Sequence, residues 1–134
     1  MTRILQPPGW ARPRGFANGI SAKGTLVFIA GQVGWTPQEE WKERSFAGQF
    51  KQALQNVLSV LREANGGPEH IARLTWYVID KREYLASLKE VGAAYRELMG
   101  KHYPTMAVVQ IGGLVEDEAR LEIEATAVIP ENEL

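Results

Sequence analysis

The sequence predicts an α+β fold in which two helices pack on one face of a mixed sheet. Apolar residues recur at three- and four-residue steps in two segments, which is the period of an amphipathic helix. Around them lie short β-branched or alternating runs bounded by Gly and Pro, which are typical of strands. The order is strand, strand, helix, strand, helix, strand, strand, and a further short strand at Arg3 to Leu5 would make six strands. Right-handed crossovers place both helices on the same face.

The N-terminal third is predicted to form an extended lead-in followed by a hairpin. Pro7, Pro8 and Pro13 fix the backbone and remove amide donors, so residues 6–14 should be non-helical. Phe16 to Ser21 and Thr25 to Ala30 flank the turn residues 23–24, which indicates two paired strands. Residues 26–30 are apolar on both faces, which favours a central strand buried on both sides.

Residues 31–41 form a loop with two glycines and a proline, and this loop contains Gln32, Trp35 and Trp41. Two interpretations of Trp35 remain open. It packs over the sheet edge, or it lines a pocket or an interface, where Trp is over-represented.

Two helices are predicted by their apolar stripes and their end signals. Ser45 is a candidate N-cap for the first, and residues 65–67, Asn-Gly-Gly, end it. Residues 71–79 form a strand, and Asp80 followed by Glu83 is a capping-box-like start for the second helix. That helix runs to Gly100. Its stripe consists of Tyr84, Leu85, Leu88, Val91, Tyr95 and Leu98.

The last third is predicted to form two antiparallel strands, residues 105–111 and 120–129, joined by a Gly-Gly and acidic turn region. Successive strand residues point to opposite faces, so Glu122 and Glu124 project together while Leu121 and Ile123 project the other way. The two carboxylates lie either on a solvated sheet face or in a pocket.

Composition excludes several classes of function. The 134 residues have the length of one domain, 1–134, and the net charge of -1, without a basic block, argues against a nucleic-acid partner. There is no Cys, and the two His are far apart in sequence, so no metal site is expected. The apolar runs are far shorter than the ~20 residues of a membrane span, so we expect a cytoplasmic protein without membrane contact.

Strands that are apolar on both faces predict self-association. Two helices can cover only one face of the sheet, and an exposed apolar face of several hundred Å² is an association surface. We therefore expect a homo-oligomer.

The chain resembles the RidA/YjgF family over nearly its whole length. The residues that carry the resemblance are Pro13 to Phe16, Gly24 to Gln32, Gln49 to Leu61, Thr75 to Asp80, Tyr84, Tyr103-Pro104 and Glu122 to Ala125. The resemblance implies a chorismate-mutase-like fold of the YjgF type, with a mixed six-stranded sheet, assembled as a homotrimer. It also implies small-metabolite pockets between subunits. In the family's deaminases these pockets hydrolyse enamines and imines such as 2-aminoacrylate, without metal or organic cofactor.

The resemblance also assigns roles to residues. An arginine that grips the substrate carboxylate in the family's deaminases is matched here by Met106, and a tyrosine by Phe16, while the glutamate that holds the attacking water is matched by Glu122. Methionine has no charge and no donor, so 2-aminoacrylate deamination should be weak or absent.

Two hypotheses follow from these residues. The first is a hydrolase or deaminase of a different imine or enamine, with Glu122 as base and Gln32 as a polar contact. The second is a non-catalytic module that binds a small ligand in a pocket lined by Phe16, Trp35, Met106 and Val108.

Overall fold

The computed structural model describes residues 2–133 and contains six strands and three α-helices in that part of the chain. The strands are β1 (Thr2–Leu5), β2 (Gly19–Ala22), β3 (Thr25–Val33), β4 (Ile71–Val78), β5 (Thr105–Gln110) and β6 (Leu121–Ile129). The helices are α1 (Phe46–Arg62), α2 (Lys81–Ala86) and α3 (Leu88–Met99), and two 3-10 turns, η1 and η2, span Pro68–His70 and Glu131–Glu133.

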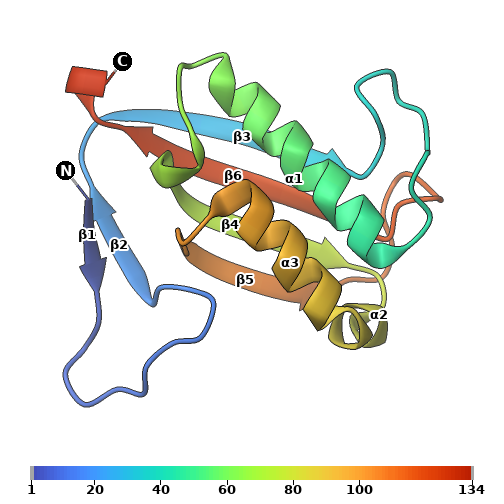
Figure 1. The fold of residues 1–134 in the computed structure, drawn as a ribbon, viewed down its shortest axis with the longest axis horizontal. Coiled ribbons are helices and arrows are strands. Elements are labelled where there is room, and N and C mark those ends of the chain that lie inside the picture. The colour runs from blue at the N-terminus through green and yellow to red at the C-terminus, as the bar shows by residue number, and fades with distance from the viewer. Residues whose placement is uncertain (1, 134) are drawn as a thin grey trace.

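The four longest strands form one sheet in the order β3-β6-β4-β5 (Figure 1). The pair β4 and β5 is parallel, whereas β6 is antiparallel to both β3 and β4, so the sheet is mixed. The helices α1 and α3 lie side by side across one face (Figure 1). This arrangement confirms the predicted α+β class with helices on one face of a mixed sheet.

The predicted strand pairings were wrong at two places. The last two strands are not a hairpin, because β6 inserts between β3 and β4 while β5 pairs only with β4. The ten residues between them, 111–120, are long enough to carry the chain past β4. A local turn signal shows that the chain reverses, but it does not select the neighbouring strand.

The N-terminal hairpin also differs from the prediction. Strand β2 pairs with β1, and the two form a separate sheet, so the six strands are divided two and four. Gly24 has a φ of +152°, and a Cβ there would lie 2.2 Å from the carbonyl oxygen of Ile129. This turn therefore packs against the end of β6 instead of closing a β2–β3 hairpin. As a result β3 is an edge strand, not the central strand expected.

The helix ends largely follow the predicted chemistry. Ser45 is the N-cap of α1, and its side chain accepts a hydrogen bond from the Gly48 amide at 3.0 Å. Asp80 caps α2 by accepting from the Arg82 amide at 2.9 Å. The predicted second helix is interrupted at Ser87, whose backbone leaves the helical region, so it forms as α2 and α3.

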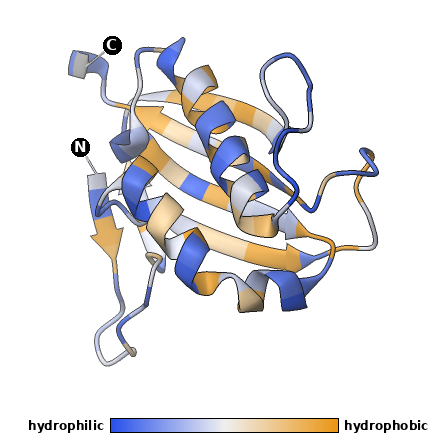
Figure 2. Cartoon of the chain, turned by 45° about the vertical axis from the view of Figure 1, so that its right-hand side comes forward, coloured by the Kyte–Doolittle hydropathy of each residue, from blue (hydrophilic) through white to orange (hydrophobic). Residues whose placement is uncertain are grey.

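The core lies between the helices and the inner face of the sheet. Phe50, Leu54 and Leu61 of α1 and Leu121 and Ile123 of β6 have no exposed surface and belong to one apolar cluster. Each such side chain contributes roughly 1.5–3 kcal/mol by burial. Figure 2 shows apolar strands beneath helices that carry many hydrophilic residues.

Candidate functional site

Strand register places the predicted site residues on two different faces of the sheet. Met106 lies beside the fully buried Leu74, and Val108 lies beside Trp76, so both face the helices. Glu122 lies beside Tyr77, on the face that no helix covers. Within one chain, Met106 and Glu122 therefore do not share a pocket.

The helix-facing residues border a cavity of about 250 Å³ between β5, α3 and the N-terminal loop, which we call the aromatic cavity. Its aromatic walls are Trp76, Tyr84, Tyr95 and Tyr103. The rings of Tyr95 and Tyr103 stack with centroids 5.2 Å apart, and Trp76 meets Tyr84 edge to face at 5.8 Å. The Tyr95 hydroxyl donates to the His102 carbonyl oxygen at 2.6 Å, and burial raises the pKa of Tyr95.

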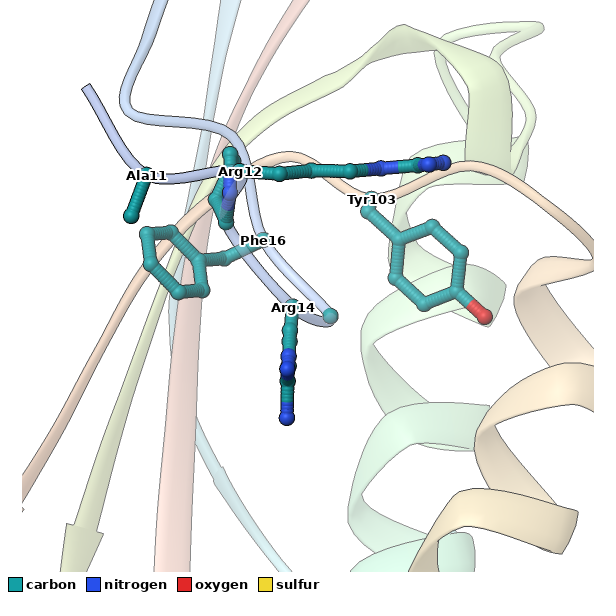
Figure 3. A pocket seen from close by; sticks show the side chains of 7 residues that line it. Ala11, Arg12, Arg14, Phe16 and Tyr103 are labelled. Carbon is teal, nitrogen blue, oxygen red and sulfur yellow. The ribbon is translucent and has the colours of Figure 1, made fainter. Parts of the chain in front are cut away.

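A larger, open cavity of about 870 Å³ adjoins it along the N-terminal loop, and we call it the arginine vestibule (Figure 3). Arg12, Arg14, Phe16 and Tyr103 line it, and Arg14, Gly15 and Tyr103 also line the aromatic cavity. The Ala17 amide donates to the Pro104 carbonyl oxygen at 3.1 Å, so the loop is tethered to the start of β5. Phe16 lines the arginine vestibule, whereas Met106 and Val108 line the aromatic cavity, so the residues predicted to share one pocket are divided between two adjoining cavities.

The uncovered face of the sheet, which we call the outer face, carries a polar band between two apolar rims. The band comprises Glu122, Glu124 and Thr126 on β6 with Arg73, Thr75 and Tyr77 on β4. The rims include Leu26 and Phe28 on β3, 57% and 73% exposed, and Val109 on β5, 40% exposed. The predicted sharing of one face by Glu122 and Glu124 is confirmed.

Two contacts organise the polar band. The Tyr77 hydroxyl donates to Glu124 Oε1 at 2.5 Å, and this hydrogen bond raises the pKa of Tyr77, with smaller effects from burial and the nearby carboxylates. Glu122 instead lies against Gly31, where an added Cβ would be 2.6 Å from the Glu122 Cδ. Glycine at position 31 therefore leaves the space that the Glu122 side chain occupies.

The two loop residues predicted for the site lie elsewhere. Gln32 Nε2 donates to the Ala30 carbonyl oxygen at 3.1 Å, at a register shift in β3. Trp35 packs against Trp41 with ring centroids 5.5 Å apart, and its carbonyl oxygen accepts from Asn56 Nδ2 at 2.8 Å. Because β3 and β5 are opposite edges of the sheet, one chain does not bring Trp35 next to Met106 or Val108.

Sequence reasoning missed the aromatic cavity as a unit. It assigned Tyr84 and Tyr95 to the apolar stripe of a helix, and Trp76 to a strand. The available signal was the aromatic residues at inward positions of β4, α2 and α3, but the sequence did not show that these elements leave a space beside them.

Across residues 2–133, no group of three or more His, Asp or Glu side chains is arranged to hold a metal ion. In the same part of the chain no helix has the length and apolar character of a membrane span.

Comparison with known proteins identifies the family. The family described as endoribonuclease L-PSP matches residues 12–129. The chain therefore belongs to this family, which is the RidA/YjgF family that its sequence resembles.

Relatives match almost end to end. The Escherichia coli K12 protein TdcF, named as a candidate reactive intermediate deaminase, is 32% identical over 134 residues, which cover 96% of this chain and 98% of TdcF. The crystal structure of YyfB from Yersinia pestis, a Rid protein of unknown function, is similar with a TM-score of 0.84 and 28% identity, covering 96% and 98% of the two chains. Escherichia coli YjgF matches with a TM-score of 0.67 and 26% identity over 84% of this chain and 87% of YjgF.

Proposed function

We propose that residues 1–134 form one domain of a homotrimer that binds a small cytoplasmic metabolite in pockets between subunits. The observation that carries the proposal is that the side chains of Met106 and Glu122 lie on opposite faces of the sheet. Side chains on opposite faces of one sheet can line one pocket only if two copies contribute them. One subunit would supply Phe16, Met106 and Val108, and its neighbour would supply Gln32 and Glu122. The exposed rims at Phe28 and Val109 are the apolar surface such an assembly would bury.

The proposed reaction is hydrolysis of an imine or enamine. An enamine first tautomerises to its imine. Glu122 takes a proton from water as the water oxygen attacks the carbon of the C=N bond, and it returns this proton to the nitrogen. The hydroxyl proton of the resulting carbinolamine then moves to the nitrogen, which leaves as ammonia and gives the carbonyl product. The described contacts leave the Glu122 carboxylate without a hydrogen-bond or ion-pair partner, so its oxygens are available to a water molecule. The candidate deaminase name of TdcF supports the same class of reaction.

We propose a substrate other than 2-aminoacrylate. An arginine that grips a carboxylate contributes roughly 1.5–3 kcal/mol, and Met106 cannot replace that contact. Release of pyruvate and ammonia from 2-aminoacrylate should therefore be at least about tenfold slower than with a relative that has arginine at this position. Equal rates would contradict the proposal.

The substitution Glu122→Gln tests the assigned base. It keeps the shape and hydrogen bonding of the side chain but removes the proton acceptor, so turnover of a C=N substrate should be lost while the trimer persists. Glu124→Gln is the matched control, because Glu124 lies on the same face but is engaged by Tyr77. Unchanged turnover in Glu122→Gln would remove Glu122 from the mechanism.

A second candidate is a non-catalytic binding module, and the aromatic cavity favours it. None of the residues that line this cavity is a carboxylate or an imidazole, so a ligand held there meets no carboxylate or histidine base from the same chain. A screen of imines and enamines in which ligands bind but none is hydrolysed would favour this candidate over the hydrolase.

A further inference from the structure

We infer that the aromatic cavity and the arginine vestibule together bind a small aromatic carboxylate, with its ring among the tyrosines and its carboxylate at the arginines. The two cavities share Arg14, Gly15 and Tyr103, so one ligand can extend across both. The inference names the ligand class of the proposed pocket, and it rests on the proposed function for the premise that this cavity receives a ligand.

The charged residues that line the two cavities are all arginines. The residues that line the two cavities include Arg12, Arg14 and Arg96 but no carboxylate, although the chain as a whole has a net charge of -1. Within residues 2–133 none of these three guanidinium groups makes a hydrogen bond or an ion pair. Other arginines of the chain are engaged, as in the pairs Arg44–Glu118 and Arg82–Asp80. Guanidinium groups without a protein partner around one opening favour an anion, and a planar fork suits a carboxylate.

The lining of the aromatic cavity indicates a flat apolar ligand body. Three tyrosine rings, one indole and the side chains of Met106 and Val108 form walls that suit a flat apolar group. Its volume of about 250 Å³ limits the ligand body to a small ring system. Met106 is then part of the apolar wall, and the anion is held at the opening by residues of the N-terminal loop and α3.

A buried indole donor indicates which polar group the ligand ring carries. Trp76 is 4% exposed, and its Nε1 has no hydrogen-bond partner among the described residues. Buried polar groups are almost always paired, and Trp76 borders the cavity. A hydroxyl on the ligand ring, opposite the carboxylate, is the acceptor that would satisfy this donor after a small adjustment of the side chains.

Three probes separate the contribution of the ligand carboxylate from that of the ring hydroxyl, and binding of each to the full chain is measured by isothermal titration calorimetry. They are 4-hydroxyphenylacetate, phenylacetate, which lacks the ring hydroxyl, and 4-hydroxyphenylethanol, which lacks the carboxylate. We expect 4-hydroxyphenylacetate to bind most tightly, with the loss of the hydroxyl weakening binding about fivefold and the loss of the carboxylate about tenfold or more. Equal affinity for 4-hydroxyphenylacetate and 4-hydroxyphenylethanol, no binding of either, or tighter binding of phenyl phosphate than of phenylacetate would overturn the inference.

Variants assign the contacts to residues. Arg14→Gln and Arg96→Gln should each weaken binding of phenylacetate without changing that of 4-hydroxyphenylethanol. Arg3→Gln, which removes the same charge from the exposed strand β1, should change neither. Trp76→Phe should abolish the preference for the ring hydroxyl. If that variant does not fold, the indole N–H resonance of Trp76 in the unaltered chain replaces it, and this resonance should shift with 4-hydroxyphenylacetate but much less with phenylacetate.

The two proposals can fail separately. Carboxylate binding that depends on Arg14 and Arg96 in a chain that sediments as a monomer would support the ligand class and reject the inter-subunit pocket. A trimer that hydrolyses imines but shows no preference for aromatic carboxylates would support the proposed function and overturn this inference.

Discussion

The two faces of the four-stranded sheet differ in composition and in what covers them, although the same strands form both. On β6, Leu121 and Ile123 face the helices with no exposed surface, while Glu122 and Glu124 alternate with them on the outer face. The inner face is completed by α1 and α3 of the same chain. The outer face presents apolar rims and a polar band to its surroundings. The contrast indicates that the inner face determines the stability of one chain, whereas the outer face is available for association and chemistry.

The largest expected effect is a loss of stability caused by a substitution in the inner face. Ile123→Ala deletes fully buried atoms and leaves a cavity, which should lower the free energy of unfolding by about 2–5 kcal/mol. Thr126→Ala, on the outer face of the same strand, should change it by only about 0.5 kcal/mol. Urea denaturation of the two variants measures both values. Similar losses would contradict the distinction between the faces.

A second substitution tests the outer face as an association surface. Val109→Asp places a charge on the apolar rim, and burying that charge in an interface is unfavourable, so the proposed trimer should dissociate. Val60→Asp on α1 is a matched control, because Val60 is 41% exposed and Val109 40%. Sedimentation velocity should show smaller particles for Val109→Asp alone. A monomeric parent chain, or a trimer in both variants, would reject association through this face.

The smallest expected effect compares two tyrosines. The hydrogen bond to Glu124 raises the pKa of Tyr77, whereas burial raises that of Tyr95. Glu124→Gln should therefore lower the pKa of Tyr77 and leave that of Tyr95 unchanged in an ultraviolet titration of the phenols, with Tyr77→Phe to identify the signal. Because folding raises the pKa of Tyr77 above 10.0, the stability from this pair is present below pH 10 and is lost as the pH rises through the folded-state value. An unchanged pKa of Tyr77 in Glu124→Gln would show that the hydrogen bond to Glu124 is not the cause of the raised pKa.

Local features of the fold were predictable because they depend on neighbours in the sequence. The cap at Ser45, the start of α2 at Asp80 and the alternation along β6 follow from side-chain chemistry and from strand geometry. Strand order was not predictable in the same way. Residues 26–30 are apolar on both faces whether their strand is central or at an edge that another chain covers, and only the three-dimensional arrangement distinguishes these cases.

The candidate site shows the same limit. Phe16 and Met106 were expected in one pocket, and the hydrogen bond between Ala17 and Pro104 does join their two segments, but Phe16 lines the arginine vestibule and Met106 the aromatic cavity. The sequence did not show that Glu122 faces the other side of the sheet from Met106, since that depends on the register of β4 with both β5 and β6. The aromatic cavity was missed because its volume arises between elements that are far apart in the sequence.

The central position of β6 also constrains how the chain can fold during synthesis. Residues 121–129 follow every other strand in the sequence, yet β3 and β4 both pair with them. Until these residues leave the ribosome, the facing edges of β3 and β4 lack their native partner, and the inner apolar residues of β6 are missing from the sheet. The four-stranded sheet therefore completes only after β6 emerges, and the preceding segments remain dependent on local helix contacts until then.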